Sequence, residues 1–186
     1  LEPYRSTVGR AKGSNMHHMR TWVSRRGATD WETLIATMPP EDQDVLRALV
    51  PVGWYDLGLQ HRLLRQIDQH FGRGDGALVD EIGVFEADQD LTVVHRLFLR
   101  LANPAFVLEK SGEYWSRFYD TGRWTIERRG RTGARGVLSE VEPFDPLFGR
   151  YLTAYIRRMW ELVGARDLQV DSRIEGTRVI LLGSWR

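Results

Sequence analysis

The chain has 186 residues, of which 42% are hydrophobic and 27% charged, a composition that suits one globular domain and excludes a disordered or fibrous chain. Its 26 Lys and Arg residues balance 25 Asp and Glu residues, so a net charge of +1 provides no general attraction for nucleic acid or anionic membranes. Cysteine is absent, which excludes disulfides, thiolate metal sites and cysteine nucleophiles.

The first two thirds of the chain predict a series of helices. Residues 1–12 show no clear period, and we expect an N-terminal arm or a short strand there, followed by one domain over residues 13–186. Thr29 and Glu32 have the spacing of a capping box, and Asp56 is suited to cap the next long helix. The predicted helices span about Ser14–Arg26, Thr29–Met38, Pro40–Leu49, Leu57–Phe71, Ala77–Ala87, Leu91–Leu101 and Pro104–Tyr119.

The last third predicts two β-hairpins that flank a long helix. Apolar and polar residues alternate from Trp124 to Glu127, and a second strand follows from Val137 to Val141. The helix begins at Pro146 and carries an apolar stripe, and strands at Leu168–Glu175 and Val179–Leu182 come after it. The fold class is therefore α+β, with an N-terminal helical part followed by a ββαββ unit that forms a four-stranded antiparallel sheet.

No arrangement of residues that indicates an enzyme or a metal centre stands out. The histidines are His17, His18, His61, His70 and His95, and they form no HExxH pattern, so we interpret them as solvated or incidental. A G-x-S-x-G motif is absent, and the glycines of residues 72–76 lack the Lys-Ser/Thr of a P-loop. The sequence predicts a non-enzymatic protein without a metal.

Aromatic residues close to predicted turns are the candidate binding residues. We expect five of them to line a ligand pocket between the helices and the sheet, although the same residues suit an ordinary core: Trp54, Tyr55, Trp115, Tyr119 and Trp124. Four arginines on a predicted hairpin loop, Arg128, Arg129, Arg131 and Arg135, suit either a phosphate or acidic partner, or a solvated tip that protects a strand edge.

Several segments resemble a paralogue-rich family best known from myxobacteria. They are residues 51–55, residues 115–122, the helix end at residues 162–165 and the hairpin that ends at Trp185, and the resemblance extends over about residues 12–186. These motifs are structural rather than catalytic, so the resemblance implies no activity.

The order of helices and strands is similar to a wider ligand-binding fold, shared by haem nitric-oxide sensors, 4-vinyl reductase domains and TRAPP vesicle-tethering subunits. In the haem sensors a helical histidine ligates the iron and a Tyr-x-Ser-x-Arg motif holds the propionates. The corresponding candidates here are His95 and the segment from Tyr114 to Arg117, which has the wrong spacing. We therefore predict no cofactor and judge haem unlikely. The 4-vinyl reductase branch implies a small hydrophobic ligand, and the TRAPP branch implies a dimerising scaffold.

We thus expect a non-enzymatic regulatory domain that binds a small apolar ligand in an aromatic-lined pocket and signals to a protein partner. The alternative is a homodimeric interaction scaffold without a ligand. No apolar run reaches the length of a membrane helix, and we expect a cytoplasmic protein without nucleic-acid binding or membrane insertion.

Overall fold

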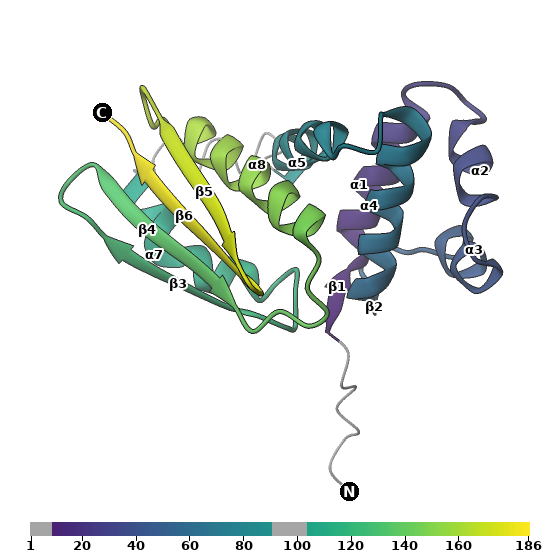
Figure 1. The fold of residues 1–186 in the computed structure, drawn as a ribbon, viewed down its shortest axis with the longest axis horizontal. Coiled ribbons are helices and arrows are strands. Elements are labelled where there is room, and N and C mark those ends of the chain that lie inside the picture. Colours follow the sequence, from purple (N-terminus) through teal and green to yellow (C-terminus); the bar gives the residue numbers. More distant parts are fainter. Residues whose placement is uncertain (1–8, 91–103) are drawn as a thin grey trace, which may run out of the picture.

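The computed structural model describes residues 9–90 and 104–186 and has an α+β architecture. A four-stranded antiparallel sheet lies at one end of the molecule, helices α1 to α4 lie at the other, and α5 and α8 lie between them (Figure 1). This arrangement confirms the predicted fold class and the ββαββ unit. The helix expected at Leu91–Leu101 falls outside the described residues.

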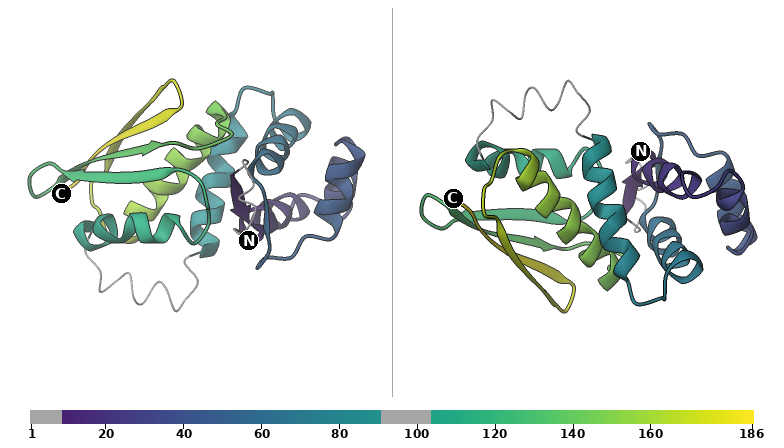
Figure 2. Two further views of the ribbon diagram at one scale, coloured as in Figure 1. Left: turned by 90° about the horizontal axis from the view of Figure 1, so that it is seen from below. Right: turned by 90° about the horizontal axis from the view of Figure 1, so that it is seen from above.

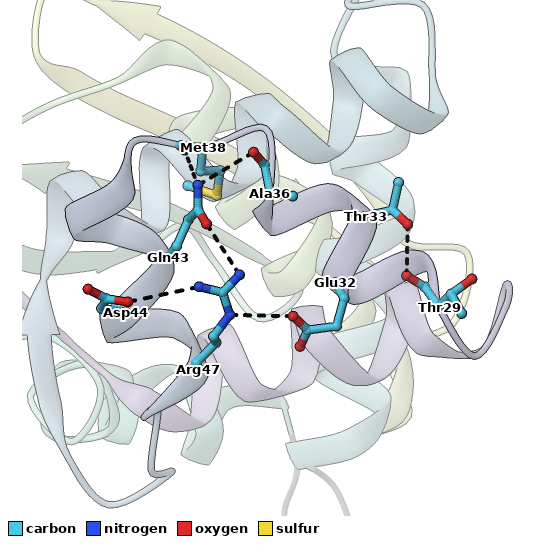
Figure 3. Close-up of polar contacts among 8 residues, drawn as sticks. All are labelled: Thr29, Glu32, Thr33, Ala36, Met38, Gln43, Asp44 and Arg47. Atoms are coloured by element: carbon cyan, nitrogen blue, oxygen red, sulfur yellow. Dashed lines mark hydrogen bonds and ion pairs between the residues drawn. The ribbon is translucent and has the colours of Figure 1, made fainter.

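The first three helices are α1 (Gly13–Ser24), α2 (Asp30–Ile35) and α3 (Pro40–Arg47). The predicted capping box is wrong, because the Thr29 side chain makes no capping hydrogen bond. Glu32 instead pairs with Arg47 of α3, and Gln43 Nε2 donates to the Met38 carbonyl oxygen across 2.8 Å (Figure 3). The Glu32 carboxylate therefore joins two helices, whereas the prediction had it reach back to its own helix end.

Strands β1 (Arg10–Lys12) and β2 (Trp54–Asp56) form a two-stranded antiparallel sheet. Ala11 pairs with Tyr55 on one side and forms an isolated bridge with Tyr119 on the other. The short N-terminal strand was one of the expected alternatives, whereas β2 was not predicted. Three-residue strands are too short to show a period, so their pairing comes from tertiary packing.

Helices α4 (Leu57–Phe71) and α5 (Ala77–Asp90) follow. The Asp56 side chain accepts a hydrogen bond from the Gly58 amide at 2.9 Å, which confirms the predicted N-cap of α4. The buried carboxylate of Asp68 accepts hydrogen bonds from the amides of Gly76 and Leu78 and so fixes the turn into α5.

The larger sheet has the strand order β3-β4-β6-β5. Its strands are β3 (Arg123–Arg128), β4 (Gly133–Ser139), β5 (Gln169–Glu175) and β6 (Arg178–Ser184), paired as the two predicted hairpins with β4 beside β6. Helix α7 (Pro104–Trp115) contacts β3, and the Trp124 ring of β3 fills the space beside Gly136.

Helix α8 (Pro146–Leu162) lies between the sheet and α5, as Figure 2 shows from two directions. The arginines predicted on its polar side pair with α5: Arg150 makes a bidentate contact with Asp80, and Arg158 pairs with Asp88. Gly83 of α5 permits the close approach, since a Cβ there would lie 2.5 Å from the Tyr151 carbonyl oxygen. Helix α8 therefore has two packed sides, and one continuous hydrophobic core extends from α1 to the sheet.

Within the described residues, none of the helices combines the length and the apolar character needed to cross a membrane.

Candidate functional site

A group of buried ionisable side chains lies where α1, α5 and α8 meet. We call it the interhelical cluster. Glu86 and Tyr151 are fully buried in it, and His18, Asp90 and Tyr155 are partly buried. Glu86 and Asp90 lie one helical turn apart on α5, so they share a face, and His18 reaches them from α1. Three helices thus bring polar groups into an otherwise apolar interior.

His18 faces both carboxylates of α5. Its Nδ1 atom lies 3.6 Å from Asp90 Oδ1 and 4.0 Å from Glu86 Oε1. Burial lowers the pKa of His18 to about 4, and neighbouring His17 contributes in the same direction. The imidazole is therefore neutral at pH 7, so these contacts are not salt bridges despite their distances.

Glu86 is almost completely buried, with 1% of its surface exposed. Burial raises the pKa of its carboxyl group well above the usual range, and the charge of Asp90 adds to this effect. Its Oε2 atom has no hydrogen-bond partner, and neither does His18 Nδ1. Two orphaned polar atoms in one small volume are costly, and such groups in a native protein call for an explanation.

Two tyrosines of α8 interact with the carboxyl groups of Glu86 and Asp90. The Tyr155 hydroxyl donates to Asp90 Oδ2 across 2.7 Å, and burial raises the pKa of Tyr155 well above its ordinary value. Burial and the Glu86 carboxyl likewise raise the pKa of Tyr151. Both phenols therefore remain protonated and can donate hydrogen bonds toward the carboxylates.

The imidazole of His61 in α4 is buried against Phe148 of α8. Its ring contacts the Phe148 ring with centroids 4.8 Å apart, and its Nε2 atom has no hydrogen-bond partner. Burial lowers the pKa of His61 to about 4, although Asp145 and Asp56 oppose the shift. Of the two interpretations, solvated or incidental, a solvated ring is excluded for His61, which is 6% exposed, while His18 is partly buried with 19% of its side chain exposed.

The predicted aromatic site is divided by the fold. Trp115 stacks on Tyr119 at a centroid distance of 4.2 Å, and Tyr119 packs edge-on against Phe148. Trp124 is partly buried against the same hydrophobic core, and its Nε1 atom donates to Ser111 Oγ at 2.7 Å. These three predicted residues therefore pack around the same core.

The other two predicted residues lie at the β1–β2 sheet. Trp54 is 36% exposed, and the Lys12 ammonium group lies 4.7 Å from its ring centroid. The Tyr55 hydroxyl accepts a hydrogen bond from the Val50 amide, so this residue braces a turn. A ligand-lining role for the five aromatics stays a prediction.

Sequence reasoning missed the interhelical cluster. Glu86 and Asp90 have i, i+4 spacing on a helix whose remaining residues are largely apolar, which was an available signal. His18 could not be assigned to them, because only the packing of α1 on α5 brings residues so distant in sequence together.

Comparison with known proteins identifies the fold. No protein-family model matches the chain, and no curated protein matches its sequence. The H-NOX protein of S. oneidensis in the Fe(II)NO ligation state aligns with a TM-score of 0.72 and 10% identity, covering 94% of this chain and 99% of that one. The fold is that of the H-NOX proteins.

Two further H-NOX structures agree. The Fe(II) unliganded protein of K. algicida gives a TM-score of 0.67 with 12% identity and covers 94% of this chain and 96% of that one. The IWP-051-bound protein of Shewanella woodyi in the Fe(II)CO state gives 0.66 with 14% identity and covers 94% of each chain. These comparisons confirm the resemblance to the haem-sensor branch of the wider fold, whereas membership of the myxobacterial family stays a prediction.

The H-NOX comparison corrects the cofactor prediction. The matching proteins are described by their Fe(II) ligation states, and another match is described by its heme redox potential. The prediction of no cofactor, with haem judged unlikely, is therefore wrong for this fold, because it relied on a short motif and not on the architecture.

The described residues meet one of the two requirements of a haem. His61 is a buried neutral imidazole and His18 a partly buried one, each with an orphaned ring nitrogen, which is the form that ligates iron. The propionate candidates differ: Ser116 and Arg117 lie on the surface, and Ser116 Oγ donates to the Glu113 carbonyl oxygen. His95 falls outside the described residues.

Proposed function

We propose that the chain is a non-enzymatic regulatory domain that senses a small apolar ligand in the interior between its helical part and its sheet unit. The H-NOX fold over 94% of the chain supports a sensor. The observation that carries the proposal is His61, a buried neutral imidazole with an unpaired Nε2 atom beside aromatic rings of the core.

In this proposal haem is the cofactor, and His61 is the described residue best suited to ligate it. When bound, haem iron supplies a coordination position for a diatomic gas. The protein's contribution is to keep the imidazole neutral through burial and to pack it against the Phe148 ring of the hydrophobic core. Trp115 and Tyr119, stacked next to Phe148, are the aromatic residues that would meet the ligand region.

Binding of a ligand in this interior can change the position of helix α8. Helix α8 contacts the core through Phe148, while Arg150 and Arg158 tie it to α5. A ligand that displaced the Phe148 ring would therefore shift α8 against α5 and the sheet. We propose that a protein partner reads this shift.

The test uses the full chain expressed in cells supplied with a haem precursor. We expect a Soret absorption band in the wild type that shifts when the reduced protein is exposed to CO. His61→Asn is expected to lose the band, whereas His70→Asn, an exposed histidine on the same helix, is expected to retain it. A band that persists unchanged in His61→Asn would reassign the ligand.

Native mass spectrometry of the same preparation tests the sensor itself. A protein that carries neither haem nor any other small molecule, and that gains none when haem is added, would contradict the proposed function.

The alternative function is a homodimeric interaction scaffold, and one observation favours it. Val50, Val52 and Trp54 are exposed beside the β1–β2 sheet, with 77% of Val52 accessible. Light scattering separates the two functions, because the scaffold requires a dimer in the absence of any ligand, and Val52→Asp would weaken that dimer.

A further inference from the structure

We propose that His18, Glu86 and Asp90 form a binding site for one divalent transition-metal ion of the Zn²⁺ or Fe²⁺ type, separate from any haem. The inference does not rest on the proposed sensor function, because it comes from the geometry and the unsatisfied atoms of the interhelical cluster alone.

The three ligand atoms already converge. His18 Nδ1, one Glu86 oxygen and one Asp90 oxygen all lie within 4.8 Å of one another, and the His18–Asp90 distance is 3.6 Å. Ligand atoms that each lie about 2.1 Å from one ion are roughly 3 to 3.5 Å from one another. Side-chain movements that displace each ligand atom by about 1 Å or less therefore complete the site.

Independent of this spacing, two of the three side chains carry buried polar atoms that no hydrogen bond satisfies. Glu86 Oε2 and His18 Nδ1 are buried and have no hydrogen-bond partner. An arginine or lysine that could neutralise Glu86 is not among the contacts of this carboxylate in the described part of the chain. A divalent cation bound by the Glu86 carboxylate and the His18 imidazole would give both side chains a partner and would balance the negative charge of the buried Glu86.

The residues around the three ligands fix the positions of their side chains. The Tyr155 hydroxyl donates a hydrogen bond to Asp90 Oδ2 at 2.7 Å. The other oxygen of this carboxylate, Oδ1, lies 3.6 Å from His18 Nδ1. The two carboxylates come from a rigid helix and the imidazole from a second helix packed against it. A nitrogen ligand among the three donors that the described residues provide favours a transition metal over Mg²⁺ or Ca²⁺, which prefer oxygen ligands.

The experiment uses tag-free full-length protein that shows no Soret band and has been treated with a chelator. We expect one Zn²⁺ per chain in isothermal titration and elemental analysis, and a rise in melting temperature with added Zn²⁺. Co²⁺ is expected to give visible absorption bands, which report the same site spectroscopically.

Matched variants distinguish this site from adventitious binding. His18→Gln and Glu86→Gln are each expected to weaken Zn²⁺ binding at least about 100-fold. His17→Gln, the adjacent residue on α1, and Glu81→Gln, an exposed residue on α5, are expected to bind as the wild type does.

Glu86→Gln also separates metal binding from folding. Because it removes a buried carboxyl group that lacks a cation, the metal-free variant is expected to melt at or above the temperature of the metal-free wild type, yet to gain nothing from Zn²⁺. If Glu86→Gln does not fold, His18→Gln decides the question. Wild-type protein without a 1:1 Zn²⁺ complex below about 10 μM, or complexes unaffected by both variants, would overturn the proposal.

Discussion

His61 shows how a single buried side chain makes stability depend on pH. Its pKa in the folded protein is lowered to about 4, below the ordinary value of 6.5, because the neutral ring is buried. The unfolded chain therefore takes up a proton first as pH falls, and the associated stability, present above pH 6.5, is lost as pH falls to about 4.

We expect His61 to account for roughly 2 kcal/mol of the stability lost between pH 7 and pH 5. The measurement is urea unfolding of wild type and His61→Leu at both pH values, with the leucine variant losing correspondingly less. His18 titrates in the same window and stays in both proteins, so it cancels in the comparison. Equal losses in the two proteins would contradict the assignment.

At the level of elements, Asp145 joins the start of α8 to α4. Its carboxylate accepts a hydrogen bond from the Leu147 amide at 2.8 Å and a second one from the Arg65 guanidinium group at 2.6 Å. We expect Asp145→Ala to lower the free energy of unfolding by about 1 to 2 kcal/mol, because the helix loses its N-cap. Asp145→Asn keeps a capping oxygen, so chemical denaturation should show a clearly smaller loss for it.

Glycines in helices test how closely α5 and α8 approach. In Gly83→Ala the new methyl group would meet the Tyr151 carbonyl oxygen at 2.5 Å, so the helices must separate. We expect a loss of about 1 to 3 kcal/mol, measured by thermal or chemical unfolding. Gly112→Ala in α7 is the matched control: its Cβ would have ordinary contact at 3.7 Å, and better helix propensity should stabilise the protein slightly. Similar effects at both positions would contradict the described packing.

At the scale of the whole molecule, the continuous core predicts that the chain unfolds as one unit. Trp22 and Trp31 report on the helical part, and Trp160 reports on the sheet unit, because it packs against Gly183 of β6. We expect tryptophan fluorescence and far-ultraviolet circular dichroism to give coincident transitions in urea. Two separated transitions would show that residues 13–186 do not form the single domain predicted from the sequence.

The long elements of the fold were predictable because each carries its own repeated signal. The apolar stripe of α8 and its Asp145-Pro146 start, the Asp56 cap of α4 and the alternation in β5 are local patterns, and each was found where expected. The β1–β2 pairing and the contact of Glu32 with Arg47 were not predictable, since they depend on partners far away in sequence.

The candidate sites follow the same division. Sequence alone determined that this is an α+β chain whose chemistry cannot involve cysteine, because composition and periodicity are local properties. Only the tertiary structure decided that His18 and His61 are neutral, that His18 lies beside Glu86 and Asp90, and that the architecture is that of H-NOX proteins. The physical reason is that burial and the convergence of polar atoms are produced by helices packing across long separations, which no short motif records.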